Sequence, residues 1–283
     1  MDEALQFGAN YTATHNVSAL AALRKLSMEE VFVGSNSRVE NDSIWWVTAL
    51  SANYPSIFRP VLDGYLIPDK DITELPLGPT NDVPLITGNT KGECGASTTK
   101  NYTVAQYDYC RSLKYDNLSS RDFQLYPAGN EFTSASSSWN NAASDTSKVS
   151  SWAHANDWIK GNATSPIYTY YWDHAPPGRK QCAFHQSEIM YVLNALYANA
   201  DTHPFTAYDY YLAEVMSGYW ANFVRKGNPD LRGAYTRGDL THCFSNDRID
   251  FVMCVGDGFG NNTVADPLKV SLMVKYSAQQ SPY

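Results

Sequence analysis

The sequence predicts an α/β fold in which strands alternate with helices. Two apolar, β-favouring runs, Val83–Thr87 and Pro166–Trp172, lie far apart in the chain, and a strongly amphipathic helical pattern follows Thr206. Strands separated by helical segments over such a length are typical of a layered architecture with a largely parallel sheet. With 283 residues, of which 43% are hydrophobic and 13% aromatic, the chain can bury a core that sustains this architecture.

The composition excludes several other classes of protein. The apolar content excludes a disordered chain, and the sequence has neither a glycine period nor the sustained heptads of a rod. No apolar run reaches the roughly 18 residues of a membrane-spanning helix. The 29 acidic residues outnumber the 21 basic ones, and no basic cluster is present to neutralise phosphates. Nucleic acid is therefore not expected as a partner.

The first part of the chain predicts short helices followed by strands. Ser18 precedes a leucine-spaced run, and Ser27 and Glu30 form a Ser-x-x-Glu capping box, so two consecutive short helices are expected. Pro60–Pro68 indicates apolar strand-like pieces hinged at an Asp-Gly turn. Val83–Thr87, a short apolar run before a turn, is typical of a buried parallel strand.

The later elements are predicted from composition and periodicity. Residues 133–151 are rich in Ser, Ala and Asn, and we expect helix and loop there. Pro166–Trp172 predicts an aromatic strand that ends sharply at the following Pro-Pro-Gly. Thr206 is the expected N-cap of the clearest helix, which Gly227 ends. The apolar face of that helix comprises Leu212, Val215, Met216, Tyr219 and Phe223.

Seven Asn-x-Ser/Thr triplets indicate N-glycosylation in a secretory route. They begin at Asn10, Asn16, Asn41, Asn101, Asn117, Asn162 and Asn261. The first residues nevertheless lack the positive and apolar regions of a signal peptide. The two observations agree if the sequence is an internal part of a longer protein, so a secreted, extracellular location is expected for that parent.

Neither a metal nor another cofactor is expected. Five cysteines leave at least one unpaired, and none has the short spacing of a zinc or redox motif. The six histidines are dispersed and lack the spacing of metal ligands.

Two turns contain candidate functional residues. Gly88–Glu93 places an acid in a glycine-bounded turn directly after a predicted strand, where α/β sheets gather functional groups. Cys182–Ile189 places His185 in a turn after the second predicted strand. Each residue alone is typical of a solvated or hydrogen-bonded loop. An acid followed by a histidine, however, is the order in which α/β-hydrolases supply the last two members of their catalytic triad.

Four stretches, in this order along the chain, resemble one known family. They are Phe58–Gly64, Gly88–Glu93, Phe184–Ile189 and Tyr219–Pro229. Together they resemble the C-terminal half of type-B carboxylesterases, the family of cholinesterases and fungal extracellular lipases. The resemblance implies half of an α/β-hydrolase fold, with an incomplete central sheet flanked by helices, as a single partial domain over residues 1–283. Within it, residues 229–283 are expected to form a divergent tail.

Carried over to this sequence, the resemblance makes Glu93 the triad acid and His185 the triad base. Glu188 is expected to support the histidine loop by hydrogen bonding to the backbone. The chain has no Gly-x-Ser-x-Gly elbow and no Gly-Gly pair for an oxyanion loop, and in the family both lie in the N-terminal half. The resemblance thus implies a serine carboxylic ester hydrolase for small-molecule or lipid esters, active only when an N-terminal half completes it.

Two other functions are compatible with such a scaffold. A non-catalytic cholinesterase-like binding or adhesion protein would keep the fold without the nucleophile, but it has no need of both Glu93 and His185. A carbohydrate-binding surface would use the many Tyr and Trp residues, which packing in the core explains more simply. The sequence alone leaves open whether this chain is itself an enzyme, and it does not identify the ester.

Overall fold

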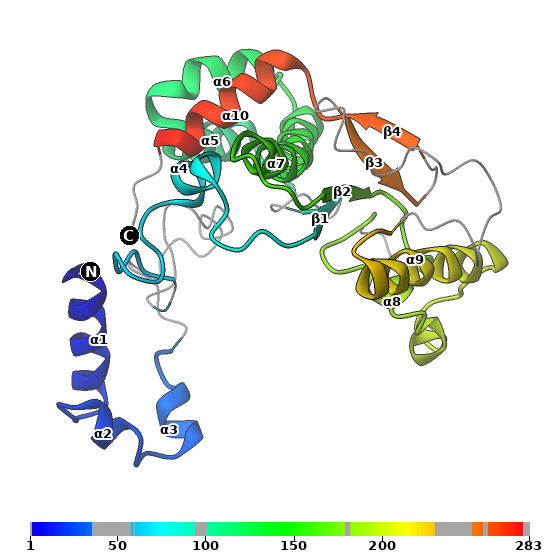
Figure 1. Ribbon diagram of the computed structural model, residues 1–283. Coiled ribbons are helices and arrows are strands. Elements are labelled where there is room, and N and C mark those ends of the chain that lie inside the picture. Colours follow the sequence, from blue (N-terminus) through cyan, green and yellow to red (C-terminus); the bar gives the residue numbers. More distant parts are fainter. Residues whose placement is uncertain are drawn as a thin grey trace. The chain divides into compact units, whose positions relative to one another are not determined.

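The structure, a computed structural model, describes residues 2–35, 58, 60–93, 101–178, 182–229, 251–256 and 260–279 (Figure 1). The chain divides into two compact units. The smaller unit consists of residues 1–74 and 279–283, and the larger unit consists of residues 75–278. Both candidate catalytic residues lie in the larger unit.

The smaller unit is helical in the part that the structure describes. It contains α1 (Asp2–Thr14), α2 (Leu20–Leu23), α3 (Met28–Phe32) and α4 (Asp71–Glu74). The capping box predicted from the sequence is confirmed at the start of α3, where the Ser27 hydroxyl accepts from the Glu30 N–H and the Glu30 carboxylate accepts from the Ser27 N–H. The predicted helix around Ser18 is shorter than its leucine spacing suggests.

The predicted Asp-Gly turn is present, but the strand-like pieces on either side of it are not. Asp63 Oδ1 accepts hydrogen bonds of 2.8 to 3.0 Å from the backbone N–H groups of Tyr65, Leu66 and Ile67. These three N–H groups would otherwise be available to a strand ladder. The expectation of strands in Pro60–Pro68 is therefore wrong, because a local side chain takes the donors.

The larger unit is built on a four-stranded sheet in the order β1 (Leu85–Thr90), β2 (Ile167–Trp172), β3 (Phe251–Val255) and β4 (Gly260–Thr263). The first three strands are parallel, and β4 runs antiparallel to β3. Both apolar runs are confirmed as neighbouring parallel strands. The sequence predicts a buried first strand, but β1 is half-buried except at Thr90. The long connection from β1 to β2 is the helical crossover that a parallel pair requires.

Helices make up most of the rest of this unit. The α-helices are α5 (Val104–Tyr115), α6 (Ser119–Leu125), α7 (Phe132–Lys160), α8 (Ile189–Val192), α9 (Ala207–Lys226) and α10 (Pro267–Gln279). The described part of this unit also contains the 3₁₀ turns η3 (Leu75–Leu77), η4 (Asp116–Leu118) and η5 (Leu196–Asn199). The expected helix and loop at residues 133–151 is instead one continuous helix. The predicted α9 is confirmed, from the capping box of Thr206 to the left-handed Gly227.

Side chains of β2 alternate between two helical layers, as the period of a strand requires. Ile167 and Tyr171 lie in buried clusters with α7 and, for Tyr171, also with α10. Tyr168, Tyr170 and Trp172 contact α9 or the core around α8 and α9. Figure 1 shows α7 on one side of β1 and β2, with α8 and α9 on the other. The larger unit is therefore a helix–sheet–helix sandwich.

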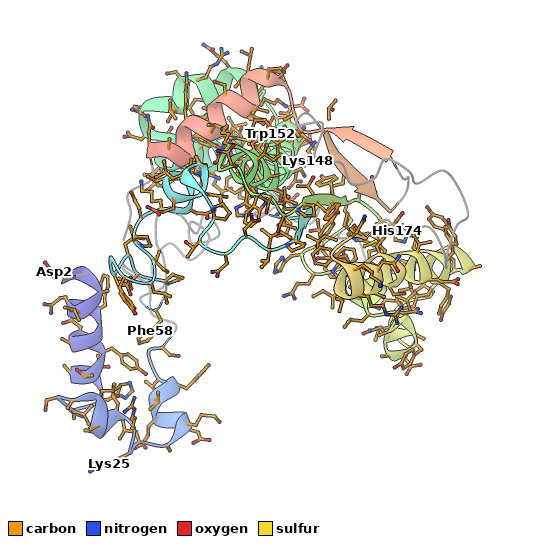
Figure 2. All side chains as sticks on the ribbon, viewed as in Figure 1. Asp2, Lys25, Phe58, Lys148, Trp152 and His174 are labelled. Atoms are coloured by element: carbon orange, nitrogen blue, oxygen red, sulfur yellow. The ribbon has the colours of Figure 1, made fainter. Side chains whose placement is uncertain are left out.

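A buried acid connects α9 to the chain that leaves β2. Asp209 accepts hydrogen bonds from the ring of His174 at 2.8 Å and from the hydroxyl of Tyr191 at 2.7 Å. Its second oxygen accepts from the backbone and hydroxyl of Thr206. Burial raises the pKa of Asp209, but these hydrogen bonds outweigh it and lower the pKa to about 2. Figure 2 shows His174 beside α9, across the sheet from Lys148 and Trp152 of α7.

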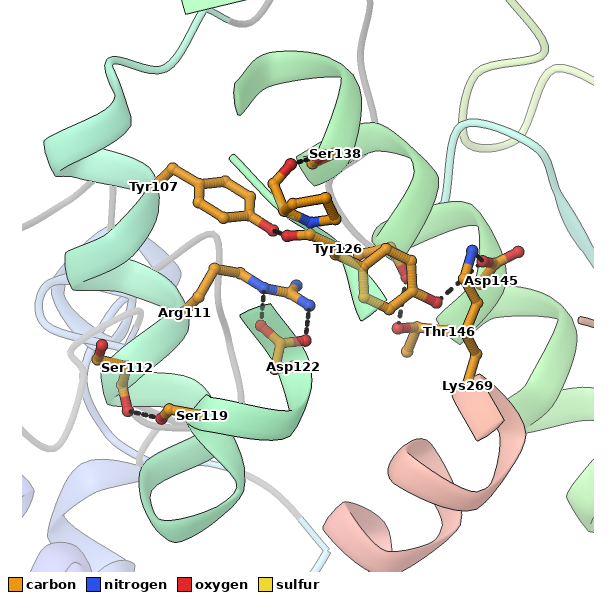
Figure 3. A network of polar contacts seen from close by, with 12 residues as sticks. Tyr107, Arg111, Ser112, Ser119, Asp122, Tyr126, Ser138, Asp145, Thr146 and Lys269 are labelled. Atoms are coloured by element: carbon orange, nitrogen blue, oxygen red, sulfur yellow. Dashed lines mark hydrogen bonds and ion pairs between the residues drawn. The ribbon is translucent and has the colours of Figure 1, made fainter. Parts of the chain in front are cut away.

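A buried ion pair holds α5 against α6 (Figure 3). Arg111 binds Asp122 through two nitrogens, with Nε at 2.8 Å from Oδ2, and both side chains are almost fully buried. The rings of Tyr107, Tyr115 and Tyr126 lie 4.7 to 5.8 Å from the guanidinium carbon, within cation–π range. Leaving one charge of such a pair without its partner is costly, because neither water nor another charge replaces it.

We expect Asp122→Asn to lower the free energy of unfolding by about 3 to 5 kcal/mol, because it leaves the Arg111 charge buried and unpaired. Urea unfolding followed by tryptophan fluorescence at one fixed chain concentration measures the change. The matched control is Lys160→Gln, which removes an exposed pair with Asp157 and should cost less than about 1 kcal/mol. Equal effects of the two variants would contradict the assignment of a buried pair.

Candidate functional site

The candidate site forms where the chain just after β1 lies beside the end of β2 and the loop that follows it. Beyond the last strand residues, the Lys91 N–H donates to the carbonyl of Trp172 at 2.8 Å, and the Gly92 N–H donates to the carbonyl of Ala183 at 2.7 Å. Gly92 and Phe184 form an isolated parallel bridge. The chain after β1 and the loop after β2 are thus joined in register. The residues that follow the bridge on the two segments are the predicted acid and base.

Glycine is required at the bridge for close approach of the two backbones. A Cβ at position 92 would lie 2.7 Å from the carbonyl oxygen of Ala183 and 3.0 Å from Cα of Phe184. Real Cβ atoms do not approach backbone this closely, so a side chain would force the two segments apart. The glycine-bounded turn seen in the sequence thus has a specific cause at Gly92.

The structure brings Glu93 and His185 together. Nδ1 of His185 lies 2.9 Å from Oε1 of Glu93, a hydrogen-bond distance between residues 92 positions apart. The Glu93 carboxylate is partly buried, with 19% of the side chain exposed, whereas the imidazole is 68% exposed. With the carboxylate ionised, Nδ1 carries the proton and donates it, so Nε2 is the free basic nitrogen. Within the described residues, Nε2 has no hydrogen-bond partner.

A hydrogen bond to β2 anchors the loop that carries His185. The hydroxyl of Ser187, fully buried, accepts a hydrogen bond of 2.9 Å from the indole N–H of Trp172. Cys182 and Gln186 adopt positive φ angles of 41° and 69°, which few non-glycine residues do. A tight turn with two left-handed residues and a buried anchor fixes the direction in which the imidazole leaves the loop.

Glu188 follows the same loop and is the N-cap residue of α8. Its Oε1 is 3.5 Å from the hydroxyl of Tyr170, a side chain on β2, and its Oε2 is buried with no hydrogen-bond partner among the described residues. Burial raises the pKa of this carboxyl group, and the nearby Glu93 carboxylate raises it further. A hydrogen bond from the backbone N–H of Glu188 lowers the pKa and opposes the effect of burial. The side chain of Glu188 thus contacts both the loop backbone, as expected, and the Tyr170 hydroxyl.

The other predicted site residues lie elsewhere or outside the description. Asn41 lies outside the described residues. Asn261 lies in β4, and its side chain is not described. The remaining predicted glycosylation residues are all exposed, at Asn10, Asn16, Asn101, Asn117 and Asn162.

The described residues contain neither a metal-binding cluster nor a membrane-spanning helix. No group of three or more His, Cys, Asp or Glu side chains there is arranged to hold a metal ion. No helix in the described part of the chain is long and apolar enough to span a membrane.

Sequence reasoning named the acid and the base but not the groups that hold them. Gly92, Thr90 and Tyr170 were not singled out as functional. The signal that could have found Gly92 is the glycine itself, since glycine in a strand pattern often marks a close approach of two backbones. Tyr170 belongs to an aromatic strand with no local sign of its role.

Comparison with known proteins places the chain in a family. The model of the carboxylesterase family matches residues 4–237. The chain belongs to the carboxylesterase family. Its fold is that of carboxylesterases, as an incomplete α/β-hydrolase: a thermophilic PNB esterase superposes with a TM-score of 0.64 at 15% identity, and a second PNB esterase with 0.61 at 16% identity. A search of the curated proteins gives no match.

The match includes nearly all of this chain but only part of each esterase. It covers 96% of this chain but 54% of each of the two esterase chains. This carboxylesterase chain therefore spans about half the length of the solved structures that it resembles.

The close approach of the two backbones at Gly92 can be tested by adding a side chain there. We expect Gly92→Ala to lower the free energy of unfolding by about 1 to 3 kcal/mol, the usual cost of forcing atoms into a packed site. The matched control is Gly8→Ala in α1, where the added Cβ has nothing within 4 Å and alanine is the better helix former. Thermal unfolding of both variants measures the difference. A Gly92→Ala chain as stable as the control would contradict the close approach.

Proposed function

We propose that this chain supplies the acid and the base of a Ser-Glu-His triad for the hydrolysis of carboxylic esters. The observation that supports the proposal most is the 2.9 Å contact between His185 Nδ1 and Glu93 Oε1. Family membership supports the reaction class, and the exposed imidazole leaves Nε2 accessible to a second reactant.

The chemistry follows from the two side chains. Nε2 of His185 accepts the proton of a serine hydroxyl as the serine oxygen attacks the ester carbonyl carbon. When the tetrahedral intermediate collapses, the imidazolium returns that proton to the leaving alcohol. Water then attacks the acyl-enzyme in the same way, and His185 passes the proton to the serine. Glu93 keeps the Nδ1 proton in place and stabilises the imidazolium through both steps.

The serine and the oxyanion donors are proposed to come from a further polypeptide segment. This chain contains no Gly-x-Ser-x-Gly sequence and no Gly-Gly pair. Among the described strands β1 lies at the end of the sheet order, so its outer edge has no partner there. A parallel strand edge next to a catalytic acid is a site where another strand can pair. We propose that an N-terminal half, absent from this sequence, pairs with this edge.

The non-catalytic alternative explains less of the geometry. A binding or adhesion protein needs the scaffold, but it does not need an imidazole oriented by a carboxylate. A carbohydrate-binding surface would use exposed aromatic side chains, but Trp139, Trp158 and Trp172 are buried in the core.

The chain alone is expected to hydrolyse p-nitrophenyl esters no faster than a denatured control, because loss of a triad nucleophile removes several orders of magnitude of rate and the oxyanion donors are missing too. Coexpression with a carboxylesterase N-terminal half that carries the serine elbow should create activity. In that complex, His185→Ala and Glu93→Ala should each lower kcat by about 10³-fold or more.

Two results would overturn this proposal. One is robust turnover by the isolated chain that disappears in His185→Ala. The other is an active complex whose kcat is unchanged by both substitutions.

We also propose that the parent protein is secreted and N-glycosylated. Five acceptor asparagines are exposed, as the modification requires. When the chain is directed into the secretory route of a eukaryotic host, peptide mass spectrometry should find glycans at Asn117 and Asn162. Asn117→Gln should remove one glycan and leave the other in place. Recovery of the secreted chain without glycans at either residue would contradict the proposal.

A further inference from the structure

A buried threonine contacts the carboxylate of the proposed triad acid. The hydroxyl of Thr90, the last residue of β1, donates to Oε1 of Glu93 at 3.2 Å, and Thr90 has no exposed surface. The same oxygen of Glu93 also accepts the hydrogen bond from His185 Nδ1. The carboxylate is therefore held by two donors, one from its own strand end and one from the histidine. Two donors on one oxygen fix its direction more closely than one.

The backbone of this strand end is held in turn by serines of α7. Ser147 Oγ, buried, donates to the carbonyl of Thr90 at 3.2 Å, and Ser144 Oγ donates to the next carbonyl, that of Lys91, at 2.7 Å. Ser151 donates to the side-chain oxygen of Asn89. Positions 144, 147 and 151 share one face of a helix. Three successive residues of β1 and its extension are thus bonded to one row of hydroxyl groups.

The Thr90 carbonyl connects the row to the acid. It accepts the Ser147 hydroxyl and also the backbone N–H of Glu93, at 3.3 Å, so both of its lone pairs are used. A change at Ser147 therefore alters a group that binds Glu93 directly. Packing against β1 requires only that the side chains on this face of α7 be small. The hydroxyl groups add hydrogen bonds to consecutive residues of the strand end, and these bonds fix its position along the helix.

We propose that Thr90 is a positioning residue for the triad acid, and that Ser144 and Ser147 hold the strand end from which Thr90 acts. This inference rests on the proposed function, because it assigns a purpose to the orientation of Glu93. Thr90 acts through Glu93 and touches no reacting atom. Its effect is to keep the carboxylate directed at Nδ1, which determines which nitrogen of His185 is free to accept a proton.

The experiment measures the tautomer of His185. The chain is labelled with ¹⁵N-histidine and studied by magic-angle-spinning NMR, which tolerates self-association through an open sheet edge. The pH is about 8.5, above the ordinary histidine pKa of about 6.5. His185→Gln identifies the signal. In the unchanged chain the Nδ1–H tautomer should predominate, since Glu93 accepts that proton.

Thr90→Val keeps the shape of the side chain and removes the hydroxyl. It should lower the ratio of Nδ1–H to Nε2–H tautomers about fivefold, which corresponds to one hydrogen bond of about 1 kcal/mol. Thr90→Ser, which retains the hydroxyl, should restore the ratio. Ser147→Ala should change it in the same direction. The control is Ser217→Ala in α9, whose exposed hydroxyl donates to the carbonyl of Glu214 in its own helix, and it should leave the ratio unchanged.

The outcomes separate the two proposals. If Glu93→Ala leaves the tautomer ratio unchanged, the acid–base pair is absent and the proposed function fails. If Glu93→Ala lowers the ratio but Thr90→Val does not, the positioning role alone is overturned. If Thr90→Val does not fold, Ser147→Ala decides, and an unchanged ratio in that variant overturns the inference.

Discussion

The hydrogen bond from the Gly92 N–H to the carbonyl of Ala183 is the contact on which the candidate site depends. It forms a separate parallel bridge between the chain just after β1 and the loop that returns after β2, about ten residues beyond the end of that strand. Because the two segments run parallel and in register, the next residue on each is brought to the same place. The 2.9 Å contact between Glu93 and His185 is a consequence of that register.

The register is stabilised on both faces of the sheet. On one face, Trp172 is fully buried with α8 and α9 and donates to Ser187 in the histidine loop. On the other face, the serines of α7 bind the carbonyls of the strand end that leads to Glu93. The acid and the base are thus each tied to a different helical layer, and the sheet between these layers sets their separation. This arrangement suits the proposed acid–base pair, which would have to stay aligned while a proton moves.

Much of this fold could be predicted from the sequence, because local interactions dominate there. The capping boxes at Ser27 and Thr206 and the apolar periodicity of α9 are patterns within a few residues, and all are present. Where the structure differs from the prediction, a side-chain hydrogen bond that the sequence pattern does not reveal decides the local structure. Asp63 takes three backbone N–H groups and prevents a strand. In α7, serine hydroxyls that would otherwise compete with the helix are bonded to β1 or to the helix's own carbonyls, so the helix is continuous.

The site was less accessible to sequence reasoning. The order acid then histidine suggested the pair, but only the family resemblance linked Glu93 to His185 across 92 positions. Nothing local indicates that Gly92 meets Ala183, because that pairing depends on the crossover between the two parallel strands and on the path of the chain from Trp172 to Ala183. Thr90 and the serines of α7 appear in the sequence as ordinary polar residues, and only their distances to the strand end give them a role.

The central claim is that the Glu93 carboxylate binds the His185 ring at Nδ1. Dipolar recoupling NMR between a ¹³C-labelled Glu93 carboxylate and ¹⁵N-labelled His185 measures this separation directly. We expect the carboxylate carbon to lie within about 4 Å of Nδ1, as a hydrogen bond of ordinary length requires, and farther from Nε2. A carboxylate carbon beyond the reach of a hydrogen bond to either ring nitrogen would contradict it.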